Sequence, residues 1–223
     1  MTQWTDSSDL IWVPVGPLRV VIWPLSTQDS LDEFERVAEG KPWNADGSGQ
    51  HSGRKREYLA SRILSERLIG GAPRRGNYGE PLWPATWAGS LSHKAGHVAL
   101  VLSRVNPALG VDLERCRIFE YGLQSKIMVD DEMALVRQLE SGASAVFSAK
   151  ESIYKALFPF VKVKFWFDAA RLIDVCFADG ELVMDYKVTR SLSNQVKEGH
   201  GIRVFGRRVV LDGAEYWLTA CEG

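Results

Sequence analysis

The sequence has little cysteine and no long apolar run, and both absences narrow the choice of protein class. Cys116, Cys176 and Cys221 are the only cysteines among 223 residues, and their spacing matches no metal or redox motif. An odd number so widely spread argues against a disulfide framework, so we expect a cytoplasmic protein. The apolar stretch 10–25 follows a polar, acidic start and is broken by three prolines, which predicts neither a signal core nor a membrane span.

The chain also lacks an excess of either charge. It has 27 lysines and arginines against 28 aspartates and glutamates, a formal net charge of -1. Such a balance gives no reason to expect a nucleic-acid partner. With 45% hydrophobic and 25% charged residues, the composition is that of a globular protein large enough for one large or two small domains. We expect a monomer.

Predicted strands and helices alternate along the chain. Short β-branched and apolar runs predict strands, and apolar residues at helical spacing predict helices. The expected strands are 11–13, 19–23, two within 89–103, 110–114, 172–177, 182–188, 202–210 and 214–220. The expected helices are 30–39, 54–69, 130–140 and 143–157, with a polar loop at 40–53. The order of these elements predicts an α/β (α+β) protein.

Two acidic residues occupy alternate positions in segment 110–114, which reads Gly-Val-Asp-Leu-Glu. Because side chains alternate between the faces of a strand, Asp112 and Glu114 should point the same way while Val111 and Leu113 face the core. The Cα atoms of the two acids would lie about 7 Å apart, so both carboxylates could reach one ion. Alone, the pair fits a solvated strand face equally well.

The predicted helix 143–157 carries charged residues beside an apolar face. Glu151 and Lys155 are four residues apart on one side of it, and Lys150 lies between the two faces. The apolar face consists of Ala149, Ile153, Ala156 and Leu157. Taken alone, Glu151 and Lys155 indicate a weak ion pair on a solvent-facing helix.

A shared metal site explains both segments together. It would combine the carboxylates of Asp112, Glu114 and Glu151 with two nearby lysines. All of these ligands are oxygens, which favours Mg²⁺, with Mn²⁺ as a possible substitute. Mg²⁺ usually binds through one or two carboxylates together with substrate phosphates, so the pattern indicates phosphate-transfer chemistry.

Five segments resemble those of the 4′-phosphopantetheinyl transferases and follow one another along the chain in the order found in that family. The resemblance is greatest to the longer, two-lobed type that activates siderophore, non-ribosomal peptide and polyketide synthases. The segments with the acids are 110–114 and 147–155, the latter reading Phe-Ser-Ala-Lys-Glu-Ser-Ile-Tyr-Lys. The others are a basic helix at 53–62, Gly-Glu-Pro-Leu-Trp-Pro at 79–84, and a turn at 89–96 that contains Ser-His. The resemblance covers about residues 50–170. Each segment alone is weak evidence, but their order makes the resemblance specific.

The resemblance implies a reaction. A serine of an apo carrier protein attacks the β-phosphate of coenzyme A, the phosphopantetheine arm moves to the serine, and adenosine 3′,5′-bisphosphate leaves. By the same resemblance, Asp112, Glu114 and Glu151 would hold Mg²⁺, and Glu151 would be the general base, directly or through a water. Lys155, with Lys150 in a similar role, would neutralise charge at the pyrophosphate.

The family's coenzyme-binding residues also match positions in this sequence. Arg54 and Arg62, eight residues apart and so on nearly one helix face, match two arginines of its basic helix. Ser92 and His93 match the turn that holds the nucleotide's 3′-phosphate, and Arg75 stands where this subgroup tends to have a lysine. Without the resemblance, the arginines fit a solvated helix face and His93 an ordinary loop residue.

The resemblance further implies two similar lobes related by a pseudo-twofold axis, with the active site in the cleft between them. We expect the lobes to be 1–108, which binds the nucleotide, and 109–223, which carries the metal and catalytic residues. An acidic acyl, peptidyl or aryl carrier would dock on a cationic and apolar patch, although the same residues could simply pack against the second lobe. The candidates for that patch are Arg115, Arg117, Ile118, Phe119, Tyr121, Leu123 and Lys126.

Two other functions use the same residues. A Mg²⁺-dependent hydrolase would cleave the coenzyme's pyrophosphate with water and need no carrier protein. A non-catalytic coenzyme A-binding module would keep the pocket but would be expected to lack a carboxylate or Lys155, and both are present.

Overall fold

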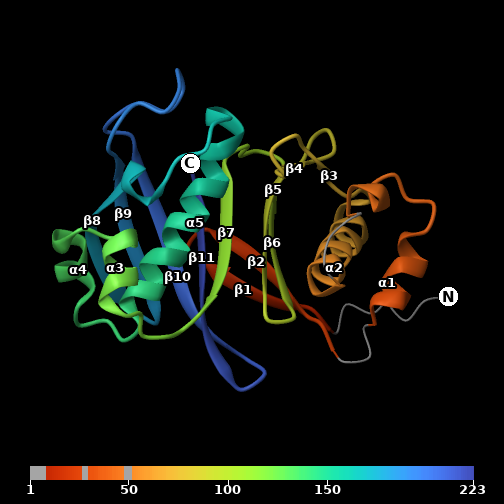
Figure 1. Cartoon of the computed structure of the whole chain (residues 1–223), viewed down its shortest axis with the longest axis horizontal. Helices are drawn as coiled ribbons and strands as arrows, with labels where there is room; N and C mark the ends of the chain where they lie inside the picture. The colour runs from red at the N-terminus through yellow and green to blue at the C-terminus, as the bar shows by residue number, and fades with distance from the viewer. Residues whose placement is uncertain (1–8, 27–29, 48–51) are drawn as a thin grey trace.

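The structure is a computed structural model and describes residues 9–26, 30–47 and 52–223. Two antiparallel sheets dominate it (Figure 1). The first has the order β1 (Ile11–Val15), β2 (Leu18–Pro24), β6 (His97–Ser103) and β5 (Ala88–Lys94). The second has the order β7 (Leu109–Arg115), β11 (Ala214–Glu222), β10 (Gly201–Leu211), β9 (Glu181–Val188) and β8 (Ala170–Ala178). A short hairpin pairs β3 (Arg74–Arg75) with β4 (Pro81–Leu82).

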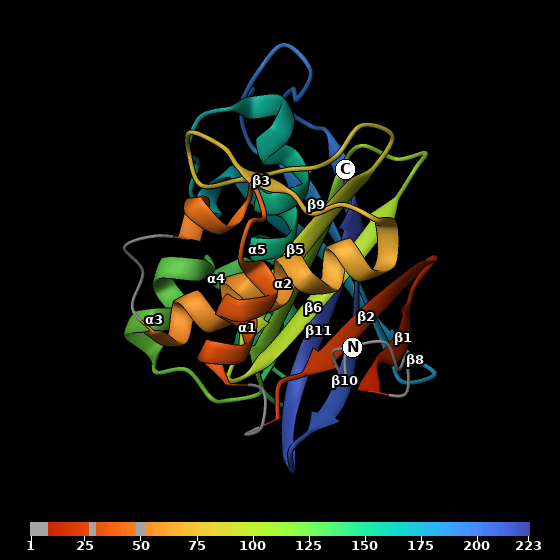
Figure 2. The same cartoon turned by 90° about the vertical axis from the view of Figure 1, so that its right-hand side faces the viewer.

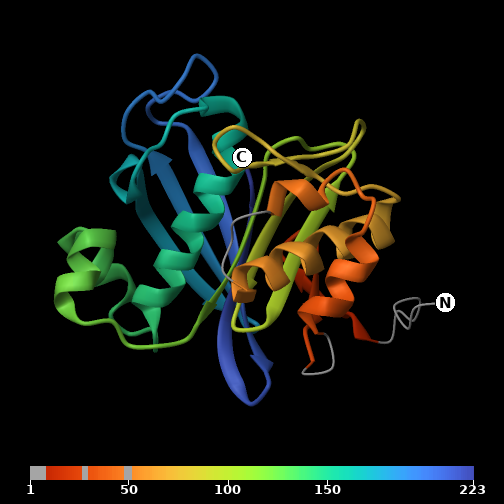
Figure 3. The same ribbon diagram turned by 45° about the vertical axis from the view of Figure 1, so that its right-hand side comes forward.

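Helices cover each sheet. Near the first lie α1 (Leu31–Ala38), the 3₁₀ turn η3 (Asn44–Gly47) and α2 (Ser52–Ile69). With the second lie α3 (Tyr121–Ile127), α4 (Asp130–Val136), α5 (Gly142–Val161) and the 3₁₀ turn η4 (Phe167–Ala169). Figure 2 shows α1 and α2 in front of the first sheet, and Figure 3 shows α2 and α5 each in front of its own sheet. The middle of α2 is buried because the helix packs between α1 and β6.

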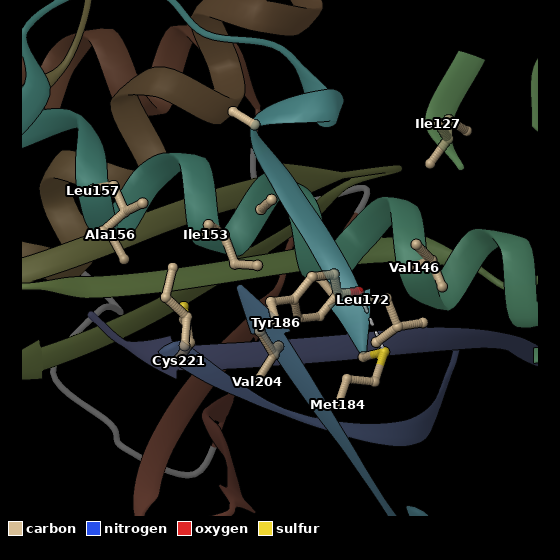
Figure 4. Close-up of a cluster of buried hydrophobic side chains, with 14 of the residues drawn as sticks. Ile127, Val146, Ile153, Ala156, Leu157, Leu172, Met184, Tyr186, Val204 and Cys221 are labelled. Carbon is tan, nitrogen blue, oxygen red and sulfur yellow. Dashed lines mark hydrogen bonds between the residues drawn. The ribbon is translucent and has the colours of Figure 1, made fainter. Parts of the chain in front are cut away.

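The close approach of α5 to β7 depends on a glycine. A Cβ atom added to Gly110 would lie 1.8 Å from the carbonyl oxygen of Ser152, so no larger residue fits there without moving the helix. On its inner face α5 buries Val146, Ile153 and Leu157 in the core of the second sheet, beside Tyr186 and other residues of β9 and β10 (Figure 4). The contact at Gly110 therefore sets how deeply α5 sits on the second sheet.

The apolar core has three parts. One lies between α5 and the second sheet, and another between the first sheet and α1 and α2. The third joins the two sheets: Val20 and Val101 of the first pack with Val111 and Leu218 of the second. The strands of the two sheets fall on either side of residue 108, but this shared layer makes their cores continuous.

The sequence predicts most of these elements correctly, and the α/β class is confirmed. The helix expected at 30–39 is α1, whose N-cap Ser30 accepts a hydrogen bond from the amide of Glu33. Three predictions differ from the structure. Segment 89–94 lies in β5, which confirms one of the two strands expected within 89–103, whereas the turn expected at 89–96 is confined to Ala95 and Gly96. Helix α3 and the β3–β4 hairpin lie in segments for which no helix or strand is predicted. The predicted loop 40–53 contains η3 and the start of α2, while its residues 48–51 lie outside the described part of the chain.

No helix in the described ranges is both long and apolar enough to cross a membrane.

Candidate functional site

Strands β5 and β7 lie side by side where the two sheets meet, and serine side chains join them. The hydroxyl of Ser90 accepts the amide N–H of Val111 at 3.1 Å, and the hydroxyl of Ser92 accepts that of Leu113 at 3.2 Å. Because strand side chains alternate, Lys94 points to the same side and reaches Glu114. We call this contact the β5–β7 seam, formed by Ser90, Ser92 and Lys94 on β5 and by residues 111–114 on β7.

Asp112 is buried in the seam and receives three donors. The hydroxyl of Ser92 donates to Oδ1 at 2.9 Å, and the ammonium of Lys155 approaches the same oxygen at 2.8 Å. The hydroxyl of Ser148 donates to Oδ2 at 3.0 Å. Asp112 and Glu114 both face β5, as the alternation of strand side chains predicts. They are only 7% and 3% exposed, so this face of β7 is buried and not solvated. The resemblance places Ser92 at a phosphate, whereas its buried hydroxyl is engaged with β7.

Glu114 has fewer partners. Its Oε2 accepts the ammonium of Lys94 at 2.7 Å. Its Oε1 is buried and accepts no hydrogen bond from the described residues, and the guanidinium of Arg117 stays 3.6 Å away. One oxygen of this buried carboxylate is therefore available to a further cation or donor.

Glu151 and Lys155 both face the seam from α5. Burial raises the pKa of Glu151, and the charge of Lys155 opposes this effect. The charges of Asp112 and Glu114 raise the pKa further, so the three carboxylates lie close enough to influence one another. Lys155 also donates to the carbonyl oxygen of Val111 at 2.9 Å. Its ion pair is with Asp112, not with Glu151 as their helical spacing suggests.

Lys150 does not join this group. Its ammonium pairs with Glu132 at 2.7 Å and donates to the carbonyl oxygens of Ile127 and Phe167. Both side chains of the pair are 2% exposed, and burial lowers the pKa of Lys150, against the opposing charge of Glu132. With three acceptors around it, this ammonium has no proton left for a phosphate, so the arrangement does not support the expected role at the pyrophosphate.

A cleft of about 1000 Å³ runs from the seam toward the first sheet. Glu151 and Lys155 line it, together with four of the predicted coenzyme-binding residues: Arg54, Arg62, Arg75 and His93. The guanidinium of Arg62 is held over the ring of Tyr58 and donates to the carbonyl oxygen of Pro73. Aromatic residues also line this cleft, among them Trp83 and Trp87.

His93 lines the same cleft. Its pKa falls to about 4 because burial disfavours the charged imidazolium, and Lys155 and Arg62 add to this effect while Asp112 opposes it. Its Nε2 is buried and has no hydrogen-bond partner among the described residues. A buried unpaired nitrogen surrounded by cations is suited to an anionic ligand.

A second cavity of about 260 Å³ lies beside the cleft. Glu151 and Tyr154 line both spaces, so these two side chains stand between them. The second cavity is lined mainly by apolar and aromatic groups, including Ile153, Phe165 and Trp166. One side of Glu151 is thus rich in cations, and the other is largely apolar.

Comparison with known proteins agrees with this geometry. The model of the 4′-phosphopantetheinyl transferase N-terminal domain matches residues 49–103, and that of the 4′-phosphopantetheinyl transferase superfamily matches residues 108–204. The chain belongs to the 4′-phosphopantetheinyl transferase family. The first match contains β5 and the basic helix, and the second contains β7 and α5, so the seam joins the two matched segments.

Relatives from bacteria support this membership. An enterobactin synthase component D from Salmonella austin is 34% identical over 128 residues, which cover 53% of this chain and 54% of that protein. The 4′-phosphopantetheinyl transferase PptT of Mycobacterium tuberculosis is 33% identical over 104 residues, 44% of this chain and 46% of PptT. Enterobactin synthase component D of Escherichia coli K12 is 34% identical over 124 residues, 48% of this chain and 57% of that protein. The chain thus spans about half the length of the curated relatives it matches.

The acidic residues of the seam fit the Mg²⁺ that the family resemblance implies. The donors are carboxylate oxygens, and one of them, Oε1 of Glu114, accepts no hydrogen bond from the described residues. The pKa of Glu151 is raised first by burial and then by the charges of Asp112 and Glu114, and a cation bound among these acids would offset both effects. Among the described residues, however, no group of three His, Cys, Asp or Glu side chains converges closely enough to form a ready-made metal site. This fits an ion that takes part of its coordination from phosphates and water.

Three further residues lie around the site that the sequence did not predict. Lys94 was not singled out, although its spacing of two from Ser92 matches the spacing of Asp112 and Glu114 and could have revealed the facing pair. Tyr154 and Lys162 line the cleft as well. Tyr154 looks in the sequence like an ordinary helix residue, and Lys162 lies beyond the expected helix, at the C-cap of α5.

Proposed function

We propose that this protein transfers the 4′-phosphopantetheine arm of coenzyme A to a serine of an apo carrier protein. The observation that carries the proposal is the position of Glu151 and Lys155 at the wall of the cation-lined cleft, next to the buried acids Asp112 and Glu114. Carboxylates and fixed cations meeting at one point are what the displacement of a phosphate ester requires.

Asp112, Glu114 and Glu151 would hold Mg²⁺ when it is bound. The ion would supply positive charge to the pyrophosphate oxygens as they gain negative charge. Lys155, which reaches into the cleft from α5, is the cation placed to contact the pyrophosphate in addition. We leave Lys150 out of this group because Glu132 neutralises it within the core.

Glu151 is our candidate for the general base. Its raised pKa makes it a better proton acceptor than an ordinary carboxylate. In the step we propose, the carrier's serine oxygen forms a bond to the β-phosphorus and the serine proton passes to Glu151. The bond from that phosphorus to the bridging oxygen breaks, and adenosine 3′,5′-bisphosphate leaves with the electron pair.

The two spaces beside Glu151 match the two ends of coenzyme A. The cleft, with Arg54, Arg62, Arg75 and His93, suits the nucleotide and its 3′-phosphate, because guanidinium groups bind phosphate oxygens in pairs. The smaller cavity suits the pantetheine arm, which is uncharged and partly apolar. In this arrangement the pyrophosphate lies between them, beside Glu151.

We propose that the carrier protein docks on residues 115–126. Ile118 and Tyr121 are 88% and 69% exposed, and Arg115, Arg117 and Lys126 add positive charge beside them. Phe119 does not belong to this surface, because it is buried against Phe147. Two relatives are named as enterobactin synthase components, so carrier domains of such synthases are the first substrates to test.

The organisation into two lobes, the monomeric state and the cytoplasmic location stay predictions. The cleft is lined by residues from both expected lobes, 1–108 and 109–223, as the predicted active site between lobes requires.

The test is to incubate the protein with coenzyme A, Mg²⁺ and a panel of apo carrier proteins, and to measure their intact masses. We expect one or more carriers to gain the mass of phosphopantetheine, and Glu151→Gln to reduce the rate by about 10²–10⁴-fold, as loss of a general base does. Hydrolysis of coenzyme A with no gain on any carrier would support the hydrolase instead. Coenzyme binding with neither reaction would indicate the non-catalytic module.

A further inference from the structure

Lys94 is built into the seam. It shares one face of β5 with Ser90 and Ser92, whose hydroxyls bond the backbone of β7, so the register of the strand directs Lys94 toward Glu114. Its ammonium lies 2.7 Å from Oε2 of a carboxylate that is only 4% exposed, while its own side chain is 36% exposed. The lysine stem thus reaches in from the surface to a buried acid.

The two acids of β7 are neutralised differently. Asp112 keeps two hydroxyl donors, from Ser92 and Ser148, even when Lys155 turns toward a substrate. Glu114 has Lys94 as its close partner at Oε2, while Oε1 accepts no hydrogen bond from the described residues and has only the more exposed guanidinium of Arg117 at 3.6 Å. A buried carboxylate without a counter-ion is strongly destabilising, so Lys94, the nearer of the two cations beside Glu114, is its main counter-charge in the metal-free fold.

We propose that Lys94 is a resident counter-ion of Glu114 and competes with the divalent metal for it. The inference rests on the proposed function in taking Asp112, Glu114 and Glu151 as the metal site. A metal that binds Glu114 must displace the ammonium or accept a like charge beside it, and either requirement lowers its affinity. The partly exposed Lys94 side chain can withdraw to solvent, whereas Glu114 is fixed in the strand.

The test measures Mg²⁺ binding by calorimetry with coenzyme A present, because phosphates supply part of the ion's coordination, and with no carrier protein, so that no transfer takes place. Lys94→Met should bind Mg²⁺ about tenfold more tightly than the wild type, because one competing charge is gone. Lys94→Arg should keep the wild-type affinity, because it keeps the charge. Lys41→Met, which removes a surface partner of Glu66 remote from the seam, is the matched control and should change nothing.

Thermal unfolding supplies a second readout. Without metal, Lys94→Met should melt below the wild type, and Mg²⁺ should raise its melting temperature more than that of the wild type. Equal or weaker Mg²⁺ affinity in a folded Lys94→Met would overturn the proposal, as would the absence of Mg²⁺ binding by both proteins. If Lys94→Met fails to fold without metal, recovery of the fold on adding Mg²⁺ supports the proposal, and failure to recover overturns it.

Discussion

Two lysines of α5, five positions apart, occupy opposite kinds of surroundings. Around Lys150 all acceptors belong to the protein: Glu132 and two carbonyl oxygens enclose the ammonium, and Glu132 in turn accepts the amides of Val129 and Leu172. Around Lys155 the side chain is 25% exposed and lines the cleft. Lys150 therefore forms a buried ion pair in the core, whereas Lys155 on the same helix faces the cleft.

The largest effect is expected when the buried charge of Lys150 is removed. Lys150→Met should lower the free energy of unfolding by about 3–5 kcal/mol, because Glu132 is left buried and unpaired. The double variant Lys150→Met with Glu132→Gln should recover part of the loss. Chemical denaturation measures both. If Lys150→Met unfolds like the wild type but transfers poorly, Lys150 belongs to the reaction after all.

Lys155→Met should show the reverse pattern. We expect transfer to fall by about 10²–10³-fold, the usual cost of losing one group that stabilises developing charge. The free energy of unfolding should change by less than that of Lys150→Met, since Asp112 retains Ser92 and Ser148. Rates from intact-mass time courses and melting curves on the same samples would decide. Equal loss of stability in the two lysine variants would contradict the comparison.

Burial of His93, together with the neighbouring cations Lys155 and Arg62, predicts a pH effect on stability. Its folded-state pKa of about 4 lies below the ordinary 6.5, so the folded protein disfavours the protonated ring. The associated stability is complete above about pH 6.5 and is lost as the pH falls toward 4, by about 3 kcal/mol at most. Urea denaturation across this range, compared with His93→Gln, measures it. An identical pH dependence in both proteins would remove His93 as the cause.

Gly110 sets the distance of α5, and with it of both lysines, from β7. Gly110→Ala should destabilise the protein by about 1–3 kcal/mol, as overpacking does, because its Cβ would meet the carbonyl of Ser152. Gly201→Ala, where a Cβ atom meets nothing within 4 Å, is the control and should stay within about 0.5 kcal/mol of the wild type. Similar melting temperatures for the two alanine variants would show that α5 moves without cost.

The sequence predicted those parts of the site that follow from local geometry. Alternation in a strand placed Asp112 and Glu114 on one face, and helical spacing placed Glu151 and Lys155 together, as observed. The partner of each charge was not predictable in this way: Lys155 pairs with Asp112 and Lys150 with Glu132, both distant in sequence. Local spacing also could not show what the Ser92 hydroxyl bonds, because that depends on the tertiary contact of β5 with β7.

The β5–β7 seam has a consequence for recombination between relatives. Two neighbouring strands here are joined by hydroxyl and ammonium groups instead of a backbone ladder, so the union of the two halves depends on these few side chains together with the apolar layer that the sheets share. A chimera that takes one half from a relative should assemble if it carries serine, serine and lysine at 90, 92 and 94 and matches the apolar layer shared by the sheets. Exchange of halves at residue 108 is thus a practical route to new pairings of coenzyme cleft and carrier surface.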